Sequence, residues 1–266
     1  MQTAVDAKHH FIVEHEVTNS GSDRDQLSTM AKKARIAVGT TDLTVFADRG
    51  YFNGKEILAC HDAGISTLVP PTKTSNAKAD GRFDKADFVY DPQKNEYRCP
   101  AGQSLIWRFV TVEKGMTNHR YWSSNCKACL LKEKCTPSPQ PRVTRWEHQD
   151  VLENMQARLE QTPEAMRIRR CTVEYPYGTI KAWMGETHFL CKGLERVKTE
   201  MSLHILAYNL KRLIAILGIA DMMKAIMAFI HLRGLKVALL AIAVAFRRGS
   251  PINRHGAVKR VLALQT

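Results

Sequence analysis

Short apolar runs alternate with stretches of helical periodicity over residues 1–70, and this pattern predicts an α/β fold. Two β-rich stretches, residues 2–7 and 11–18, predict a hairpin. A helix is expected over residues 23–35, because Ser22 and Asp25 form a capping-box pattern at its start.

The next segment predicts a β-α-β unit. Residues 43–47 and 65–69 are short apolar runs typical of buried strands, and Asn53 is a suitable N-cap for a helix between them. Such a unit makes a parallel strand pair with a right-handed crossover. Asp48 directly follows the first run, and ligands in open α/β sheets collect at the carboxyl ends of strands. Asp48 therefore has either a chemical role or the role of a turn-forming aspartate.

A polar middle section follows. Residues 70–85 are typical of a linker, because they combine prolines, a Ser-Asn pair and a glycine. Short β-like pieces then occur at residues 88–90, 104–112 and 119–122. We therefore expect a small β-rich insertion in the α/β fold.

This insertion holds four cysteines with the spacing C-x26-C-x2-C-x5-C: Cys99, Cys126, Cys129 and Cys135. The set predicts either a structural Zn²⁺ site with thiolate ligands or ordinary reduced thiols. Three other cysteines lie in apolar or helical surroundings, and we expect them to be buried thiols: Cys60, Cys171 and Cys191.

Helical periodicity dominates the rest of the chain. Thr144 and Glu147 predict a helix that runs to about residue 160, and Thr162 is expected to cap the next one. A strong amphipathic helix is predicted over residues 198–217, with a leucine stripe that we expect to pack on the sheet: Leu203, Leu206, Leu210, Leu213 and Leu217.

Further helices are expected at residues 222–230 and 235–246. The basic tail beyond them is expected to be a loosely ordered, solvated end: Arg247, Arg248, Arg254, Lys259 and Arg260.

One charged stripe stands out in the helix after Thr162. Arg167, Arg170, Glu174 and Lys181 follow at steps of three, four and seven, which places them along one helical face. The stripe is either a solvated face with local ion pairs or a functional surface. Pro176 should kink or restart this helix.

The charge balance points to a polyanionic partner. Thirty-nine Lys and Arg against 26 Asp and Glu give a net charge of +13 and a pI near 9.5, so we expect nucleic acid before membrane. A ribosomal or merely basic protein is the alternative on composition alone. No signal-peptide pattern opens the sequence, and an odd cysteine count fits a reducing compartment, so we expect a cytoplasmic, nucleoid-associated protein.

Several motifs resemble bacterial insertion-sequence transposases of the DDE type. Arg170-x3-Glu174-x6-Lys181 resembles the signature around the last catalytic carboxylate, with Arg167 where the family has a tyrosine. Ala-Asp48-Arg-Gly-Tyr resembles the segment of the second catalytic aspartate. Tyr-Arg-Cys99-Pro and Cys126-Lys-Ala-Cys resemble the cysteine-bearing insertion of these enzymes. The resemblance covers about residues 2–218.

The resemblance implies an RNase H-like mixed sheet flanked by helices. It divides the chain into catalytic-core residues 1–70, a cysteine-rich insertion at 71–145, the helical remainder of the core at 146–218, and a helical, basic extension at 219–266. It assigns Asp48 and Glu174 to Mg²⁺ or Mn²⁺, and Arg167, Arg170 and Lys181 to DNA. It also implies a homodimer acting on insertion-sequence ends and target DNA.

The family's first catalytic aspartate lies on a first strand that has no match here. We therefore expect a copy truncated at its N-terminus, with little strand-transfer activity. Asp6 is the acid on the early strands that could substitute, although its family counterpart is a hairpin residue. A non-catalytic DNA-binding remnant and a metal-dependent nuclease of the same fold are the alternative functions.

Overall fold

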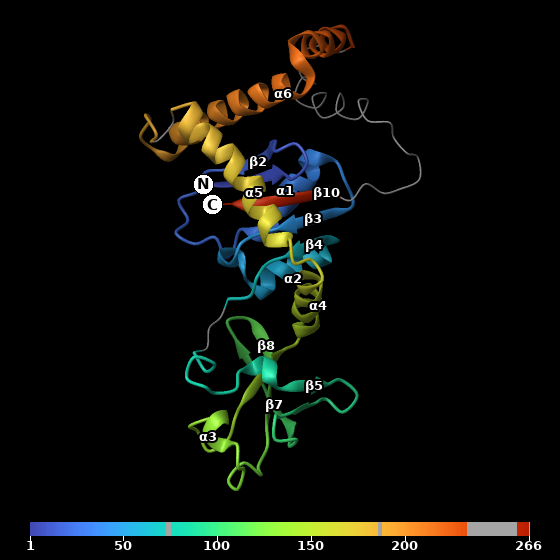
Figure 1. Ribbon diagram of the computed structural model, residues 1–266, viewed down its shortest axis with the longest axis vertical. Coiled ribbons are helices and arrows are strands. Elements are labelled where there is room, and N and C mark those ends of the chain that lie inside the picture. The colour runs from blue at the N-terminus through green and yellow to red at the C-terminus, as the bar shows by residue number, and fades with distance from the viewer. Residues whose placement is uncertain (73–75, 186–187, 233–259, 266) are drawn as a thin grey trace. The chain divides into compact units, whose positions relative to one another are not determined.

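The computed structural model describes residues 1–72, 76–185, 188–232 and 260–265. The chain forms two compact units, Met1–Pro71 with Met155–Thr266 and, between them in sequence, Thr72–Asn154 (Figure 1). Each unit is built on its own β-sheet.

The described sheet of the first unit has five strands in the order β2-β1-β10-β3-β4. β1 is antiparallel to both of its neighbours, and β10, β3 and β4 are mutually parallel. The predicted hairpin and the parallel pair are therefore both present. The strands are β1 (Gln2–Asp6), β2 (Ile12–Glu16), β3 (Leu43–Phe46), β4 (Ile65–Leu68) and β10 (Arg260–Gln265).

The central strand of this sheet is β10, which comes from the far end of the sequence. It hydrogen-bonds to β1 on one side and β3 on the other, and Leu262, Ala263 and Leu264 are fully buried. The expectation of a loosely ordered, helical and basic end is wrong for residues 260–265. Their apolar character is explained by this central place, since strands buried on both faces are continuously hydrophobic.

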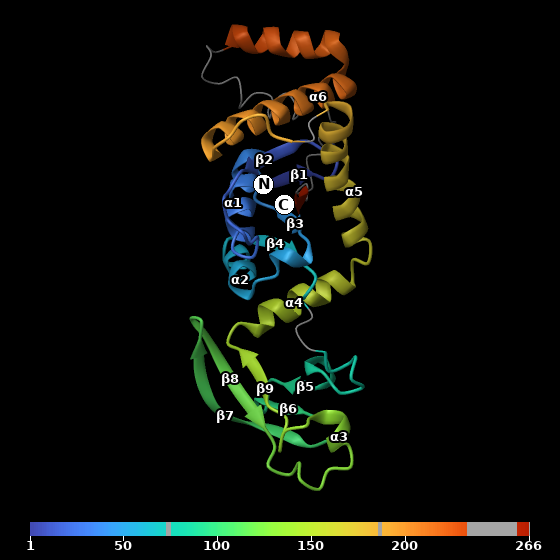
Figure 2. The same cartoon turned by 90° about the vertical axis from the view of Figure 1, so that its left-hand side faces the viewer.

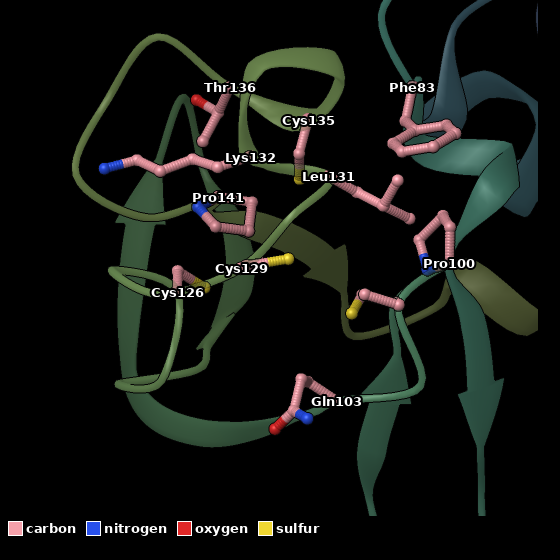
Figure 3. Close-up of a pocket in the computed structure, with 12 residues that line it drawn as sticks. Phe83, Pro100, Gln103, Cys126, Cys129, Leu131, Lys132, Cys135, Thr136 and Pro141 are labelled. Carbon is pink, nitrogen blue, oxygen red and sulfur yellow. The ribbon is translucent and has the colours of Figure 1, made fainter.

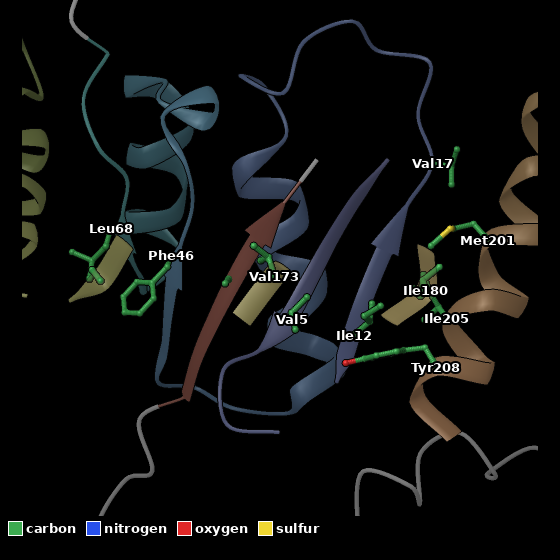
Figure 4. Close-up of a cluster of buried hydrophobic side chains, with 12 residues drawn as sticks. Val5, Ile12, Val17, Phe46, Leu68, Val173, Ile180, Met201, Ile205 and Tyr208 are labelled. Atoms are coloured by element: carbon green, nitrogen blue, oxygen red, sulfur yellow. The ribbon is translucent and has the colours of Figure 1, made fainter. Parts of the chain in front are cut away.

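Helices cover both faces of the first sheet (Figure 2). α1 (Leu27–Val38) and α2 (Gly54–Asp62) lie on one face, and α5 (Ala165–Gly178) lies on the other, against β10, β1 and β3. Val5, Phe46 and Ala263 of the sheet pack with Val173 of α5 in one core (Figure 4). This mixed α/β architecture is compatible with the RNase H-like fold that the sequence predicts.

Local capping chemistry was predicted correctly for α2 but not for three other helices. Asn53 caps α2 by accepting a hydrogen bond from Lys55 N. α1 begins at Leu27, after an N-cap without a side-chain bond, because the Ser22 hydroxyl instead accepts from Arg24 N in a turn. α4 (Gln149–Glu160) begins after residue 147, since Thr144 lies in a strand.

Thr162 does not cap α5. Its hydroxyl donates to the carbonyl of Arg158 at the end of α4, and the N-cap of α5 is Glu164. Ser and Thr hydroxyls can bond backward to a carbonyl as readily as forward to an amide. The sequence pattern does not distinguish these two choices.

The leucine stripe of α6 (Leu194–Leu232) faces away from the sheet. Met201, Ile205 and Tyr208 are the residues that pack in the core, whereas Leu203 and Leu206 are 61% and 56% exposed. The prediction that the leucines pack on the sheet is therefore wrong. Both faces of the helix are apolar, so periodicity alone could not select the packed one.

Polar side chains of α6 bind the outer edge of β2. The Asn209 amide accepts from Ile12 N at 3.0 Å and donates to Ile12 O at 2.8 Å. Tyr208 Oη and Arg212 Nε donate to the carbonyls of His10 and His9. These bonds satisfy backbone groups that an open edge strand would leave exposed.

One segment of α6, Leu194–Ala228, is also long and apolar enough to cross a membrane by length and composition alone.

The second unit is an antiparallel sheet in the order β5-β6-β7-β8-β9. Its core is small and aromatic, with Tyr97, Leu105 and Tyr121 buried together. The strands are β5 (Val89–Asp91), β6 (Glu96–Arg98), β7 (Ser104–Glu113), β8 (Met116–Trp122) and β9 (Val143–Trp146), and a short helix, α3 (Lys132–Cys135), follows β8.

The three cysteines outside the insertion do not share one environment. Cys60 is fully buried in α2, and burial raises the pKa of its thiol to about 12. Cys171 and Cys191 are exposed, so the expectation of buried thiols is wrong for both. The predicted helix at residues 235–246 and the basic residues Arg247, Arg248, Arg254 and Lys259 lie outside the described residues.

The place of β10 in the sheet can be tested by matched leucine substitutions. Leu262→Ala removes a fully buried side chain and should lower the free energy of unfolding by about 2–5 kcal/mol. Leu203→Ala removes a side chain that is 61% exposed and should change it by no more than about 0.5 kcal/mol. Urea unfolding followed by circular dichroism measures both values, and equal effects would contradict a central β10.

Candidate active site and cysteine cluster

Asp48 lies at the carboxyl end of β3, where the sequence places it. It is the N-cap of a short 3₁₀ helix, η1 (Arg49–Tyr51), and its Oδ1 accepts from Gly50 N at 2.8 Å. The β10–β3 register pairs Ala263 with Phe46, and continuing it by two residues brings Gln265 level with Asp48. The neighbour of Asp48 on the central strand is thus an amide residue and not an acid.

Arg169 is the charged partner of Asp48. Its Nη2 donates to Asp48 Oδ2 at 2.9 Å, and its Nε and Nη2 each lie 3.4 Å from the carbonyl oxygen of Leu264. The Arg169 side chain is 17% exposed and that of Asp48 is 40% exposed. One guanidinium therefore joins α5, the end of β3 and the end of β10.

Helical spacing explains why Arg169 reaches the sheet. Ala165, Thr172, Val173 and Pro176 are the buried residues of α5, and Arg169 falls on their stripe at the i+4 position from Ala165. Sequence reasoning missed Arg169 because it lies beside the motif residue Arg170. The four-residue spacing from Ala165 is the signal that could have found it.

The predicted stripe of α5 lies on the opposite, solvent-facing side. Arg167, Arg170, Glu174 and Lys181 are all exposed. Among the described residues, the hydrogen bonds and ion pairs of Asp48 reach Gly50 and Arg169, and none reaches Glu174. The structure therefore brings Asp48 to Arg169, while Glu174 projects into solvent from the opposite side of α5.

Pro176 changes the helix as its chemistry requires. It has no N–H to donate to the carbonyl of Thr172, and His10 Nδ1 lies 3.4 Å from that oxygen instead. Three residues after Pro176 the helix passes into a π-helical turn, η3 (Thr179–Trp183), which contains Lys181. A change of helical type at this point resets the direction in which Lys181 projects relative to Glu174.

This arrangement does not fit the two divalent ions of the DDE reaction. Both oxygens of Asp48 have protein partners, and no group of three or more His, Cys, Asp or Glu among the described residues is placed to hold a metal ion. Asp6 is not level with Asp48 in the sheet. It pairs with Leu262, which pairs with Val45, so Asp6 lies three residues, or roughly 10 Å, along the sheet from the level of Asp48.

Asp6 also has a local role in the hairpin. Its carboxylate accepts a hydrogen bond from His9 N at 2.8 Å, and its carbonyl accepts one from His10 N. These bonds close the turn between β1 and β2.

In the second unit, four cysteines line one small cavity of about 20 Å³ (Figure 3). Cys99 follows β6, Cys126 and Cys129 lie in the turns after β8, and Cys135 ends α3. Burial, followed by the neighbouring thiols, raises the pKa of Cys126 and of Cys135. The cavity thus collects the four thiols that the sequence spacing predicts.

Tight turns present these cysteines. Gly102 N donates to Cys99 O at 2.8 Å and Cys99 N donates to Gln103 O, while Lys132 N donates to Cys129 O. Gly102 has φ +77°, which a glycine adopts without strain. The donor set fits Zn²⁺ chemically, although as the described side chains stand no three of them are close enough to hold an ion.

The Arg169–Asp48 pair should show measurable coupling in a double-mutant cycle. Arg169→Ala and Asp48→Ala should couple by about 1 kcal/mol, a modest value because Asp48 is partly solvated. Each single change also removes one further bond, that of Arg169 to Leu264 O or that of Gly50 N to Asp48, so only the coupling energy isolates the pair. The control cycle of Arg170→Ala with Asp48→Ala should give a coupling near zero in urea unfolding. Equal coupling in both cycles would contradict the observed pairing.

Comparison with known families gives one match. The family model described as a transposase DDE domain matches residues 98–214, which include the four clustered cysteines and the α5 stripe but not Asp48. No curated protein and no solved structure matches the chain. The family implies DNA as the partner, and its members generally use a divalent metal ion. The match supports the identification of this chain as a DDE-type transposase.

Proposed function

We propose that this chain performs the DNA-binding part of transposition and does not cleave DNA by itself. The observation that carries the proposal is the pairing of Asp48 with Arg169 at a sheet end where β10 supplies no carboxylate. The exposed bases of α5 and η3, inside the matched residues, supply the DNA-binding surface.

The charge of the α5 face favours a phosphate backbone. Arg167, Arg170 and Lys181 are exposed and Glu174 is the acid among them, so the stripe carries a net positive charge. Guanidinium and ammonium groups bind phosphate oxygens and position a protein on DNA without reading its sequence. By family resemblance the DNA-bound form is a nucleoid-associated homodimer, and sedimentation of the complex tests that assembly.

Catalysis of the DDE type needs carboxylates that hold two metal ions beside the scissile phosphate. Asp48 and Glu174 remain the residues that the resemblance assigns to Mg²⁺ or Mn²⁺, but they have no described contact with one another. A guanidinium on Asp48 neutralises the charge that would attract a cation. For this reason the proposal assigns binding, and not cleavage, to the chain.

Duplex binding should depend on the α5 stripe and on salt. Changing Arg167, Arg170 and Lys181 together to alanine should weaken binding and make the slope of log K against log salt shallower by about 2.7, or roughly 0.9 for each lost phosphate contact. The matched control changes Arg24, Lys32 and Lys55, which are exposed bases in or near α1 and α2. Fluorescence anisotropy with a labelled duplex measures both, and equal losses would exclude a specific role for α5.

The same preparation should not nick the duplex in Mg²⁺ or Mn²⁺. Nicking that Asp48→Asn abolishes would overturn the non-catalytic proposal and assign a metal-dependent nuclease or transposase activity to the chain. If nicking is seen and Asp48→Asn abolishes it, unchanged duplex binding by this variant would show that it is folded and has lost only cleavage.

We also propose that Cys99, Cys126, Cys129 and Cys135 bind a structural Zn²⁺ ion. Their shared cavity and the two turns that present them support this assignment. A unit with so small a core gains stability from a metal, because four thiolates tie its loops together. With only thiol ligands at the cavity, the ion would have no open position for catalysis.

The chain purified with Zn²⁺ should contain about one ion per molecule by elemental analysis, as expected for a four-thiolate site. Changing Cys126 and Cys129 to serine should remove the ion and lower the melting temperature. Changing Cys171 and Cys191, which are exposed, should do neither. In alkylation of the native protein, Cys171 and Cys191 should react first and the clustered thiols only after chelation. A metal content unaffected by the Cys126 and Cys129 changes would exclude this site.

A further inference from the structure

The outer face of the second sheet is unusually rich in exposed apolar and aromatic side chains. Its core lies on the other side, with Leu105 and Tyr121 fully buried. An antiparallel sheet with one packed face is expected to be polar on the other. Here Phe109 and Ile106 are 45% and 46% exposed, and Ile106 pairs across the strands with Trp122.

A β-bulge in β7 concentrates side chains around Trp122. Trp107 pairs with Tyr121 and Phe109 pairs with Arg120, so Arg108 is the extra residue. A bulge re-aims side chains that would otherwise alternate between faces. As a result, the Arg108 guanidinium lies 5.4 Å and the Phe109 ring 5.6 Å from the centre of the Trp122 ring.

Arginines make this face cationic. The Arg142 guanidinium lies 5.6 Å from the same Trp122 ring, and Arg120 bonds to Thr144 and Glu113 on the neighbouring strands. In the described part of the chain, the ion pair between Arg120 and Glu113 is the one that joins any of these three arginines to a carboxylate. Arg108 Nη2 already donates to Ser124 Oγ at 2.9 Å, whereas Arg142 is exposed beside the ring, so its guanidinium can donate to an acceptor.

We propose that Arg108, Phe109, Trp122 and Arg142, here called the Trp122 face, bind single-stranded DNA. The inference rests on the proposed DNA-binding function and gives this face a ligand distinct from that of α5. Arginine edges match the phosphates of the strand in charge, and the exposed Phe109 ring offers a surface on which a base can stack. Paired bases inside a duplex cannot stack on such a ring, so the face favours an unpaired strand.

Fluorescence anisotropy of the full chain with a labelled oligodeoxythymidylate tests this inference, with a mixed-sequence duplex as the second probe. Phe109→Ala should weaken single-strand binding by at least about fivefold and leave duplex binding unchanged. Phe109→Tyr keeps a stacking ring and should restore the affinity. Arg142→Ala should weaken single-strand binding and make its salt slope shallower by about 0.7.

Two control variants match these changes. Trp107→Ala removes an aromatic side chain that is 44% exposed on the same strand but directed to the other face, and Lys94→Ala removes an exposed base in the turn between β5 and β6. Neither should alter single-strand binding by more than about twofold, the size of a minor surface effect.

The inference would be overturned if both Phe109→Ala and Arg142→Ala bound the single strand with wild-type affinity. It would also be overturned if the wild type bound only the duplex. In both cases the proposed function would stand. Failure of the wild type to bind either probe would overturn the proposed function itself. Loss of single-strand binding in the Trp107→Ala control would also contradict the assignment to this face.

Discussion

The central place of β10 is the constraint on which the first unit depends. Without this strand, β1 and β3 would each have an unpaired edge in the middle of the sheet, and α5 would lose the surface it packs on. Arg169 strengthens the arrangement, because it bonds both to the backbone of Leu264 and to Asp48. A strand distant in sequence, β10, thus holds together the sheet, the candidate centre and α5, the helix that carries the basic stripe.

This arrangement has an electrostatic consequence. A carboxylate at the end of a parallel strand can hold a cation, and here the nearby cation is a guanidinium fixed by its own helix. Because Arg169 also bonds to the carbonyl of Leu264, β10 helps to hold the guanidinium beside Asp48. The completed sheet thus contributes to the charge balance of the centre.

Features with local causes could be predicted from the sequence. The hairpin, the β3-α2-β4 unit, the Asn53 cap and the grouping of four cysteines each follow from residues close together in the chain or from regular spacing. The place of β10 could not be predicted, since its apolar run of four residues, 261–264, does not specify which strands it will pair with. The packed face of α6 was missed for a related reason: Met201, Ile205 and Tyr208 compete with an equally apolar leucine stripe, and only the sheet edge decides between them.

The second unit combines a small core with an outer face that is not simply polar. Tyr90 and Tyr121 both donate hydrogen bonds to Asn95, so part of the core's stability comes from polar contacts between tyrosine hydroxyls and one amide. A sheet stabilised from one side, and tied at one end by the cysteine cavity, does not require the opposite face for packing. That face can therefore present Phe109 and Trp122 among arginines. Exposed aromatic rings are costly to leave in water, but they bind favourably to the bases of a nucleic acid strand.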